Sequence, residues 1–153
     1  MEQSMNITNG KTEIHINGDP NKTIWINLND SGIITRANKA QKDLRQLADS
    51  LQAVSDKGLQ GDAFFDALEK AEKEARDALD YVCDAKVADV VFGLSSPFAI
   101  VREDGTTYFE AFVEALMPMV GNQQKALHQA AQESKQRVAK HINKYARDRE
   151  DAE

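Results

Sequence analysis

The sequence predicts a single domain over residues 1–153 with a mostly α-helical α+β fold, in which an N-terminal β-hairpin precedes a bundle of about four helices. Apolar residues alternate with polar ones before residue 30, whereas later they recur every three or four positions. Charged residues make up 29% of the chain and aromatic residues 7%, which suits long surface helices better than a sandwich or a barrel. Hydrophobic residues, at 41%, are numerous enough to form a core.

The hairpin is predicted in residues 1–30. Isoleucine alternates with polar residues before Gly18-Asp19-Pro20-Asn21 and with Trp25 and Asn27 after it. The residue types of the segment between favour a tight turn. We therefore expect paired strands at Glu13–Asn17 and Thr23–Leu28. Because an isolated hairpin is only marginally stable in water, its isoleucine face is expected to pack on the helices or to join the sheet of a neighbouring subunit.

Two long helices are predicted in residues 31–93. The first begins near Ser31 and ends near Gly58, and its apolar residues are spaced alternately by three and four, as in a heptad seam: Ala37, Ala40, Leu44, Leu47, Leu51 and Val54. The second is expected to begin with Asp62 as its N-cap and to continue to Gly93.

An irregular linker is predicted at residues 94–105, because serine, proline and a Glu103-Asp104-Gly105 turn interrupt the helical pattern. C-terminal helices are predicted at residues 106–149, and an acidic tail at residues 150–153. Proline cannot donate the helical hydrogen bond, so Pro118 is expected to end or kink the first of these helices.

The first C-terminal helix is expected to face the core with Phe109, Phe112 and Leu116. The last helix, from about Met119 to Arg149, carries a seam that polar residues weaken: Leu127, Ala131, Ser134, Val138, His141 or Ile142, and Tyr145. Narrow seams favour packing within the bundle or association with another helix. For contacts with a partner we favour three of these residues: Val138, Ile142 and Tyr145.

Catalytic, cofactor-binding and metal sites are not predicted. His15, His128 and His141 have no partners at the spacing of metal ligands. Cys83 follows an apolar helix face and is expected to be buried as a small hydrophobic residue. Neither a G-x-S-x-G motif nor a glycine-rich phosphate loop occurs. We therefore expect a non-enzymatic protein that requires no cofactor.

The sequence also limits the compartment. A single cysteine cannot form an internal disulfide, which excludes a disulfide-stabilised secreted domain. Residues 1–10 lack the basic and apolar regions of a signal peptide. The apolar runs are only a few residues long, against roughly 18 or more for a membrane span. The prediction is a cytoplasmic protein with no membrane contact.

Charge is distributed unevenly along the chain. The total is −6, yet residues 125–149 contain seven Lys and Arg residues against Glu133 and Asp148. This basic helix either docks an acidic partner or a nucleic-acid backbone, or it is a solvated face beside an acidic body. The acidic total and the presence of Tyr145 as the only aromatic residue in the segment disfavour nucleic acid.

Two motifs and a closing basic helix resemble a known family. Cys83 to Gly93 ends in Asp89-Val90-Val91-Phe92-Gly93, and Tyr108 to Pro118 reads Tyr-Phe-Glu-Ala-Phe-Val-Glu-Ala-Leu-Met-Pro. A basic helix then closes with His141-Ile142-Asn143-Lys144-Tyr145. This arrangement, over roughly residues 80–145, resembles the tail assembly chaperones of tailed phages and prophages of Gram-positive bacteria.

The resemblance implies a non-enzymatic chaperone in the cytoplasm of the bacterial host. Such a protein binds the tape-measure protein, keeps its hydrophobic helices soluble and helps to recruit tail-tube subunits. The resemblance assigns no contact residue. Two other functions stay open: a small phage structural or adaptor protein that forms homo-oligomers, and a helical protein that binds nucleic acid through its basic C-terminal helix.

Overall fold

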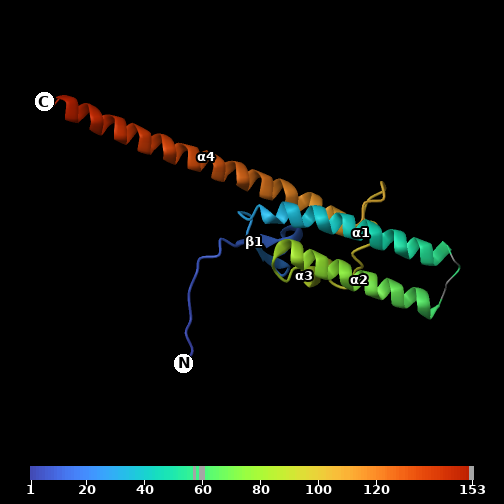
Figure 1. The fold of residues 1–153 in the computed structure, drawn as a ribbon. Helices are drawn as coiled ribbons and strands as arrows, with labels where there is room; N and C mark the ends of the chain where they lie inside the picture. The colour runs from blue at the N-terminus through green and yellow to red at the C-terminus, as the bar shows by residue number, and fades with distance from the viewer. Residues whose placement is uncertain (57, 59–60, 152–153) are drawn as a thin grey trace.

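The computed structural model describes residues 1–56, 58 and 61–151, with side chains up to residue 149. Within these ranges a two-stranded antiparallel hairpin is followed by four α-helices (Figure 1). The predicted mostly α-helical fold with an N-terminal β-hairpin is therefore confirmed. Residues 1–11 run away from the hairpin as an exposed segment.

The hairpin consists of β1 (Thr12–His15) and β2 (Thr23–Ile26). Both strands are shorter than the predicted Glu13–Asn17 and Thr23–Leu28. A 3-10 turn, η1 (Ile16–Gly18), takes the place of the end of the first predicted strand. The central asparagine of this turn has a left-handed φ of 53°, which asparagine tolerates better than most residues and which ends the extended backbone.

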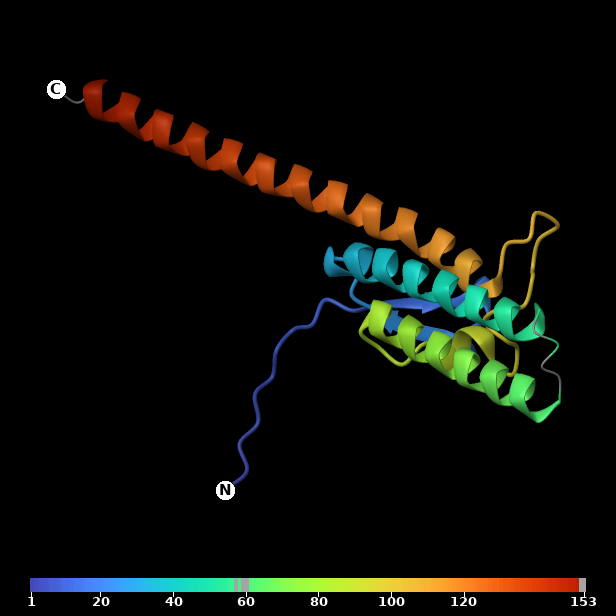
Figure 2. The same ribbon diagram turned by 45° about the vertical axis from the view of Figure 1, so that its right-hand side comes forward.

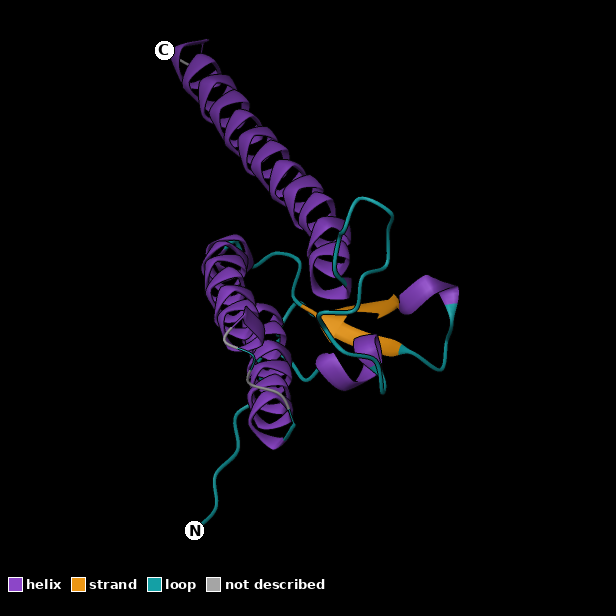
Figure 3. Ribbon diagram, turned by 90° about the vertical axis from the view of Figure 1, so that its right-hand side faces the viewer, coloured by secondary structure: helices purple, strands orange, loops and turns teal. Residues whose placement is uncertain are grey.

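The isoleucine face of the hairpin packs on the helices, which is the first of the two options that the sequence left open. In the strand pair Ile14 lies opposite Ile24, and Glu13 lies opposite Trp25. Ile24 and Ile26 are buried, while Trp25 between them is 51% exposed. Figure 3 shows the hairpin beside the first turns of α4.

The helices α1 (Gly32–Asp56) and α2 (Asp62–Cys83) lie side by side (Figure 2). At the start of α1, the Asp30 carboxylate accepts a hydrogen bond from the Gly32 backbone N–H at 2.8 Å, which satisfies a donor that the helix leaves free. The prediction that Asp62 is an N-cap is wrong, because Gly61 occupies that position and Asp62 begins the helix. There its charge still suits the helix dipole.

The second long helix predicted to reach Gly93 is in fact two helices, α2 and the short α3 (Ala88–Phe92). Asp84 takes a left-handed conformation with φ of 49°, which ends α2. The Asp80 carboxylate then accepts two successive backbone N–H groups at the start of α3, both at 2.8 Å. This local capping outweighs the helical spacing of the apolar residues.

The linker predicted at residues 94–105 is irregular, with a single antiparallel bridge between Ile100 and Thr107. Arg76 of α2 anchors its beginning. The Arg76 Nη2 group donates to the carbonyl oxygens of Gly93 and Ser95, at 2.7 and 2.9 Å. The guanidinium also lies over the ring of Phe92, 5.7 Å from its centroid.

The C-terminal helices predicted at residues 106–149 are one helix, α4 (Tyr108–Asp151). Pro118, predicted to end or kink the first of them, lies inside α4. Proline removes one backbone hydrogen bond, but its ring here is on the exposed side of the helix. Leu116 and Val120, on either side of it, are both buried, so tertiary packing supports the helix across the proline.

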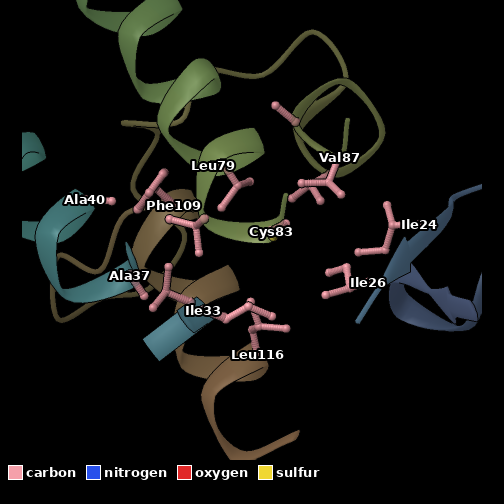
Figure 4. Packing of buried hydrophobic residues seen from close by; sticks show 14 of the residues in the cluster. Ile24, Ile26, Ile33, Ala37, Ala40, Leu79, Cys83, Val87, Phe109 and Leu116 are labelled. Atoms are coloured by element: carbon pink, nitrogen blue, oxygen red, sulfur yellow. The ribbon is translucent and has the colours of Figure 1, made fainter. Parts of the chain in front are cut away.

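The core forms where β2, α1, α2, α3 and the first half of α4 meet (Figure 4). The predicted core residues Phe109 and Leu116 are buried, and Phe112 is half-buried. In the predicted seam of α1, the first three residues are buried and the last three half-buried. Figure 4 shows side chains from β2, α1, α2, α4 and the residue before α3 converging: Ile24, Ile26, Ile33, Ala37, Leu79, Cys83, Val87, Phe109 and Leu116.

Candidate functional site

The second half of α4 stands apart from the rest of the chain. Every side chain from Lys125 to Arg149 is exposed, and the helix runs well beyond the other elements (Figures 1 and 2). At about 1.5 Å per residue this segment is about 37 Å long. We call residues 125–149 the extension and residues 12–124 the body.

The other elements of the body contact α4 as far as the last turn before the extension. The Gln123 Nε2 group donates to the Asn29 side-chain oxygen at 2.8 Å, and the Gln124 Nε2 group donates to the Asn29 backbone oxygen at 2.9 Å. Val120, one turn earlier, is fully buried. These two glutamines therefore mark the boundary between the buried and the exposed halves of the helix.

The extension carries a stripe along one side that is apolar except for Ser134. Its members are spaced by three or four residues, which places them on one helix face: Leu127, Ala131, Ser134, Val138, Ile142 and Tyr145. The predicted partner contacts Val138, Ile142 and Tyr145 are 56%, 60% and 66% exposed. The structure thus leaves these three side chains accessible, and their role in binding stays a prediction.

The stripe continues the face that packs on the core. Residues 18 positions apart lie in nearly the same direction on a straight helix, because 18 residues make about five turns. Leu127 therefore lies on the same side of α4 as Phe109, five turns further along, and Val138 lies on the same side as Val120. Phe109 and Val120 are both 0% exposed, whereas Leu127 is 41% and Val138 is 56% exposed. One face of α4 is thus covered in the body and uncovered in the extension.

The charge of the extension is opposite to that of the rest of the chain. Its seven Lys and Arg residues against two acidic residues give a net charge of +5, within a chain of net charge −6. Since all these side chains are exposed, the extension is a positively charged rod with an apolar stripe. Such a surface suits a partner that is both apolar and acidic.

A second apolar surface lies in the body, and the sequence did not reveal it. A pocket of about 290 Å³ opens between the hairpin and the first half of α4. Ile14 and Ile16 line it from the hairpin side, and Phe112 and Met119 line it from the helix. The signal in the sequence was the alternation of isoleucines, but periodicity alone did not show that two of them are only half-buried.

The single cysteine of the chain is buried in the body. Cys83 is 3% exposed, as expected, and burial, with a smaller contribution from the charge of Asp80, raises the pKa of its thiol to about 12. A thiol with this pKa is not a nucleophile near neutral pH. Within residues 1–56, 58 and 61–149, no group of three or more His, Cys, Asp or Glu side chains could hold a metal ion.

The chain was compared with protein-family models, curated proteins and solved structures, and no significant match was found. In the part of the chain that the structure describes, no helix is both long and apolar enough to cross a membrane. Among the described residues, the apolar surfaces that remain accessible include the stripe of the extension and the pocket between the hairpin and α4.

Proposed function

We propose that this chain is a non-enzymatic tail assembly chaperone of a tailed phage or prophage. It would bind the tape-measure protein in the bacterial cytoplasm, keep that protein soluble and help to recruit tail-tube subunits. The observation that carries the proposal is the exposed stripe of the extension. A chaperone for a long helical protein needs an apolar surface that is accessible while its own body stays folded.

The two motifs that carry the family resemblance support the proposal, because they pack on each other at the base of α4. The rings of Phe92 and Tyr108 meet edge to face, with centroids 5.1 Å apart. The Tyr108 hydroxyl donates to the backbone oxygen of Val91 at 2.8 Å. Both motifs therefore belong to the packed body, while the extension stays accessible to a partner.

The first experiment is to sequence the DNA that spans and follows the 3′ end of the gene. The proposal expects a slippery run with an overlapping −1 reading frame, and then a very long reading frame with helical periodicity. If neither is present, the tail assembly proposal fails. If both are present, the long reading frame supplies the partner for the second experiment.

The second experiment is co-expression of the chain with the product of that long reading frame. We expect the product to be insoluble alone and soluble with the chain. Val138→Asp should abolish the rescue, because it places a charge in the stripe. Gln136→Asp is the matched control, since it adds the same charge on the opposite side of the helix. Equal rescue by both variants would exclude the stripe as the binding surface.

Nucleic-acid binding is the alternative that one observation favours, namely the exposure of all seven basic residues of the extension. It predicts an affinity that falls steeply with salt and is lost when Lys140, Lys144 and Arg147 are replaced. A chaperone that does not bind nucleic acid would show no such salt-dependent affinity for a nucleic-acid probe. The protein content of finished phage particles distinguishes the adaptor alternative, because an adaptor stays in the particles and a chaperone leaves them.

A further inference from the structure

The basic residues of the extension form two groups relative to the stripe. In the heptad register with Ala131, Val138 and Tyr145 at position a, the flanking positions e and g hold Lys135, Arg137 and Lys144, and Arg149 takes position e beyond the stripe. Lys125, Lys140 and Arg147 lie on the outer side, away from the stripe. All seven side chains are exposed, so the two groups differ in direction and not in accessibility.

The flanking positions carry one sign of charge. Between Leu127 and Tyr145 the only carboxylate is that of Glu133, which takes the outer position c in the same heptad register. Residues that flank an apolar seam face the flanks of the partner helix and decide which partner pairs with it. Two copies of the extension, parallel or antiparallel, would bring basic flanks together, and like charges there oppose pairing.

From this pattern we infer that the extension binds an amphipathic helix whose apolar stripe is flanked by Asp and Glu residues. Val138, Ile142 and Tyr145 contact the apolar residues of that helix, and the flanking lysines and arginine pair with its carboxylates. The distance from Leu127 to Tyr145 is about 27 Å at about 1.5 Å per residue, which accommodates five turns of a partner helix. The inference deepens the proposed function, because it specifies the kind of tape-measure segment that the extension would recognise.

The test uses the full chain and two synthetic helical peptides, so it does not depend on the tape-measure protein. Both peptides have leucine at the seam positions a and d. One has glutamate at the flanking positions e and g, and the other has lysine there. Repulsion between like flanks also hinders each peptide from pairing with itself. Binding of fluorescein-labelled peptide is measured by anisotropy at several salt concentrations.

We expect the glutamate peptide to bind and the lysine peptide not to bind. The triple variant Lys135→Glu, Arg137→Glu, Lys144→Glu should weaken binding of the glutamate peptide by about tenfold or more and should bind the lysine peptide instead. The matched triple Lys125→Glu, Lys140→Glu, Arg147→Glu changes the net charge equally, and its affinity should stay within about threefold of the unaltered chain.

Three results would overturn the inference. The first is failure of the glutamate peptide to bind. The second is an equal loss of affinity in the two triple variants, together with binding of duplex DNA and no effect of Val138→Asp, which would indicate a nucleic-acid surface. The third is self-association of the unaltered chain in sedimentation that Val138→Asp abolishes, which would make a second copy the occupant.

The inference and the proposed function fail in different ways. If the glutamate peptide binds but the product of the long reading frame is not rescued, the recognition of an acidic helix stands and the tail assembly role fails. If the product is rescued while neither peptide binds, the tail assembly role stands and the inferred recognition of an acidic helix fails. Circular dichroism of each triple variant checks that α4 is still helical.

Discussion

The two halves of α4 present the same apolar face to different surroundings. In the first half Phe109, Val113, Leu116 and Val120 are all buried, at 0% to 2% exposure. In the second half the residues five turns further along are exposed, and Val138 shows the contrast most directly because Val120 is also a valine. Nothing in the local sequence pattern distinguishes the two valines. What differs is that the hairpin and α1 reach the first half only.

This comparison shows that an amphipathic pattern predicts a helix and a binding face, but not the partner of that face. In the body the partner belongs to the same chain. In the extension no element of the described chain covers the stripe, and the charge of its flanks indicates which helix would do so. The predictions below test whether the body and the extension are as independent as their burial indicates.

The largest effect is expected from introducing the same charge into the two halves. Val120→Asp places an unpaired carboxylate in the core and should destabilise the fold by about 4 kcal/mol or more. Val138→Asp should change the free energy of unfolding by less than about 0.5 kcal/mol, because the side chain is already in water. Reaction of the single cysteine, Cys83, with a maleimide reports opening of the body. Fast labelling of Cys83 in the Val138→Asp variant would contradict the independence of the body from the extension.

A second prediction extends the comparison to polar contacts. Asp80→Ala removes the acceptor of two hydrogen bonds at the start of α3, so about 2 kcal/mol of stability should be lost. Asp77→Ala, in the same helix, removes only an exposed ion pair with Lys73 and should cost less than about 0.5 kcal/mol. Urea unfolding followed by circular dichroism measures both variants. Equal losses would show that Asp80 is not a structural cap.

Side-chain caps of this kind could not be predicted from the spacing of apolar residues. Hydrophobic periodicity was sufficient for the hairpin, for α1 and for the core side of α4, because those elements follow a regular spacing. It failed at Asp84 and at Pro118. In the first case, the regular pattern is divided because the Asp80 side chain accepts hydrogen bonds from backbone N–H groups seven and eight residues further along. In the second, packing of the flanking turns kept a helix intact across a residue that usually breaks it.

The candidate site was predicted in part for a similar reason. Spacing was enough to select Val138, Ile142 and Tyr145 as one face, and the structure leaves that face exposed. Spacing could not show where the exposed half begins, since this depends on Asn29 reaching Gln123 and Gln124. That contact joins positions more than 90 residues apart, and no local pattern specifies it.

A smaller effect is expected from the pH dependence of the body. A hydrogen bond from the Arg36 guanidinium, and a second one from the Gly32 N–H, hold the pKa of Asp30 below its usual value of 3.8. The stability due to the ionised carboxylate is therefore present above about pH 4 and is lost as pH falls through the lowered pKa. Because the pair is partly exposed, the loss should be about 0.5 kcal/mol. Urea unfolding at pH 7 and pH 3 should show part of this loss as the difference between the unaltered chain and the Asp30→Asn variant.

The smallest effect on stability, and the sharpest test of the comparison, is expected from deleting the extension. A chain that ends at Gln124 keeps Val120 and both glutamine contacts with Asn29, so it exposes no new core surface. Its free energy of unfolding should therefore lie within about 0.5 kcal/mol of that of the full chain, while the helical signal per molecule falls. A loss of several degrees in Tm would mean that the extension folds back onto the body. An unchanged Tm together with lost binding of the glutamate peptide would assign stability to one half of α4 and recognition to the other.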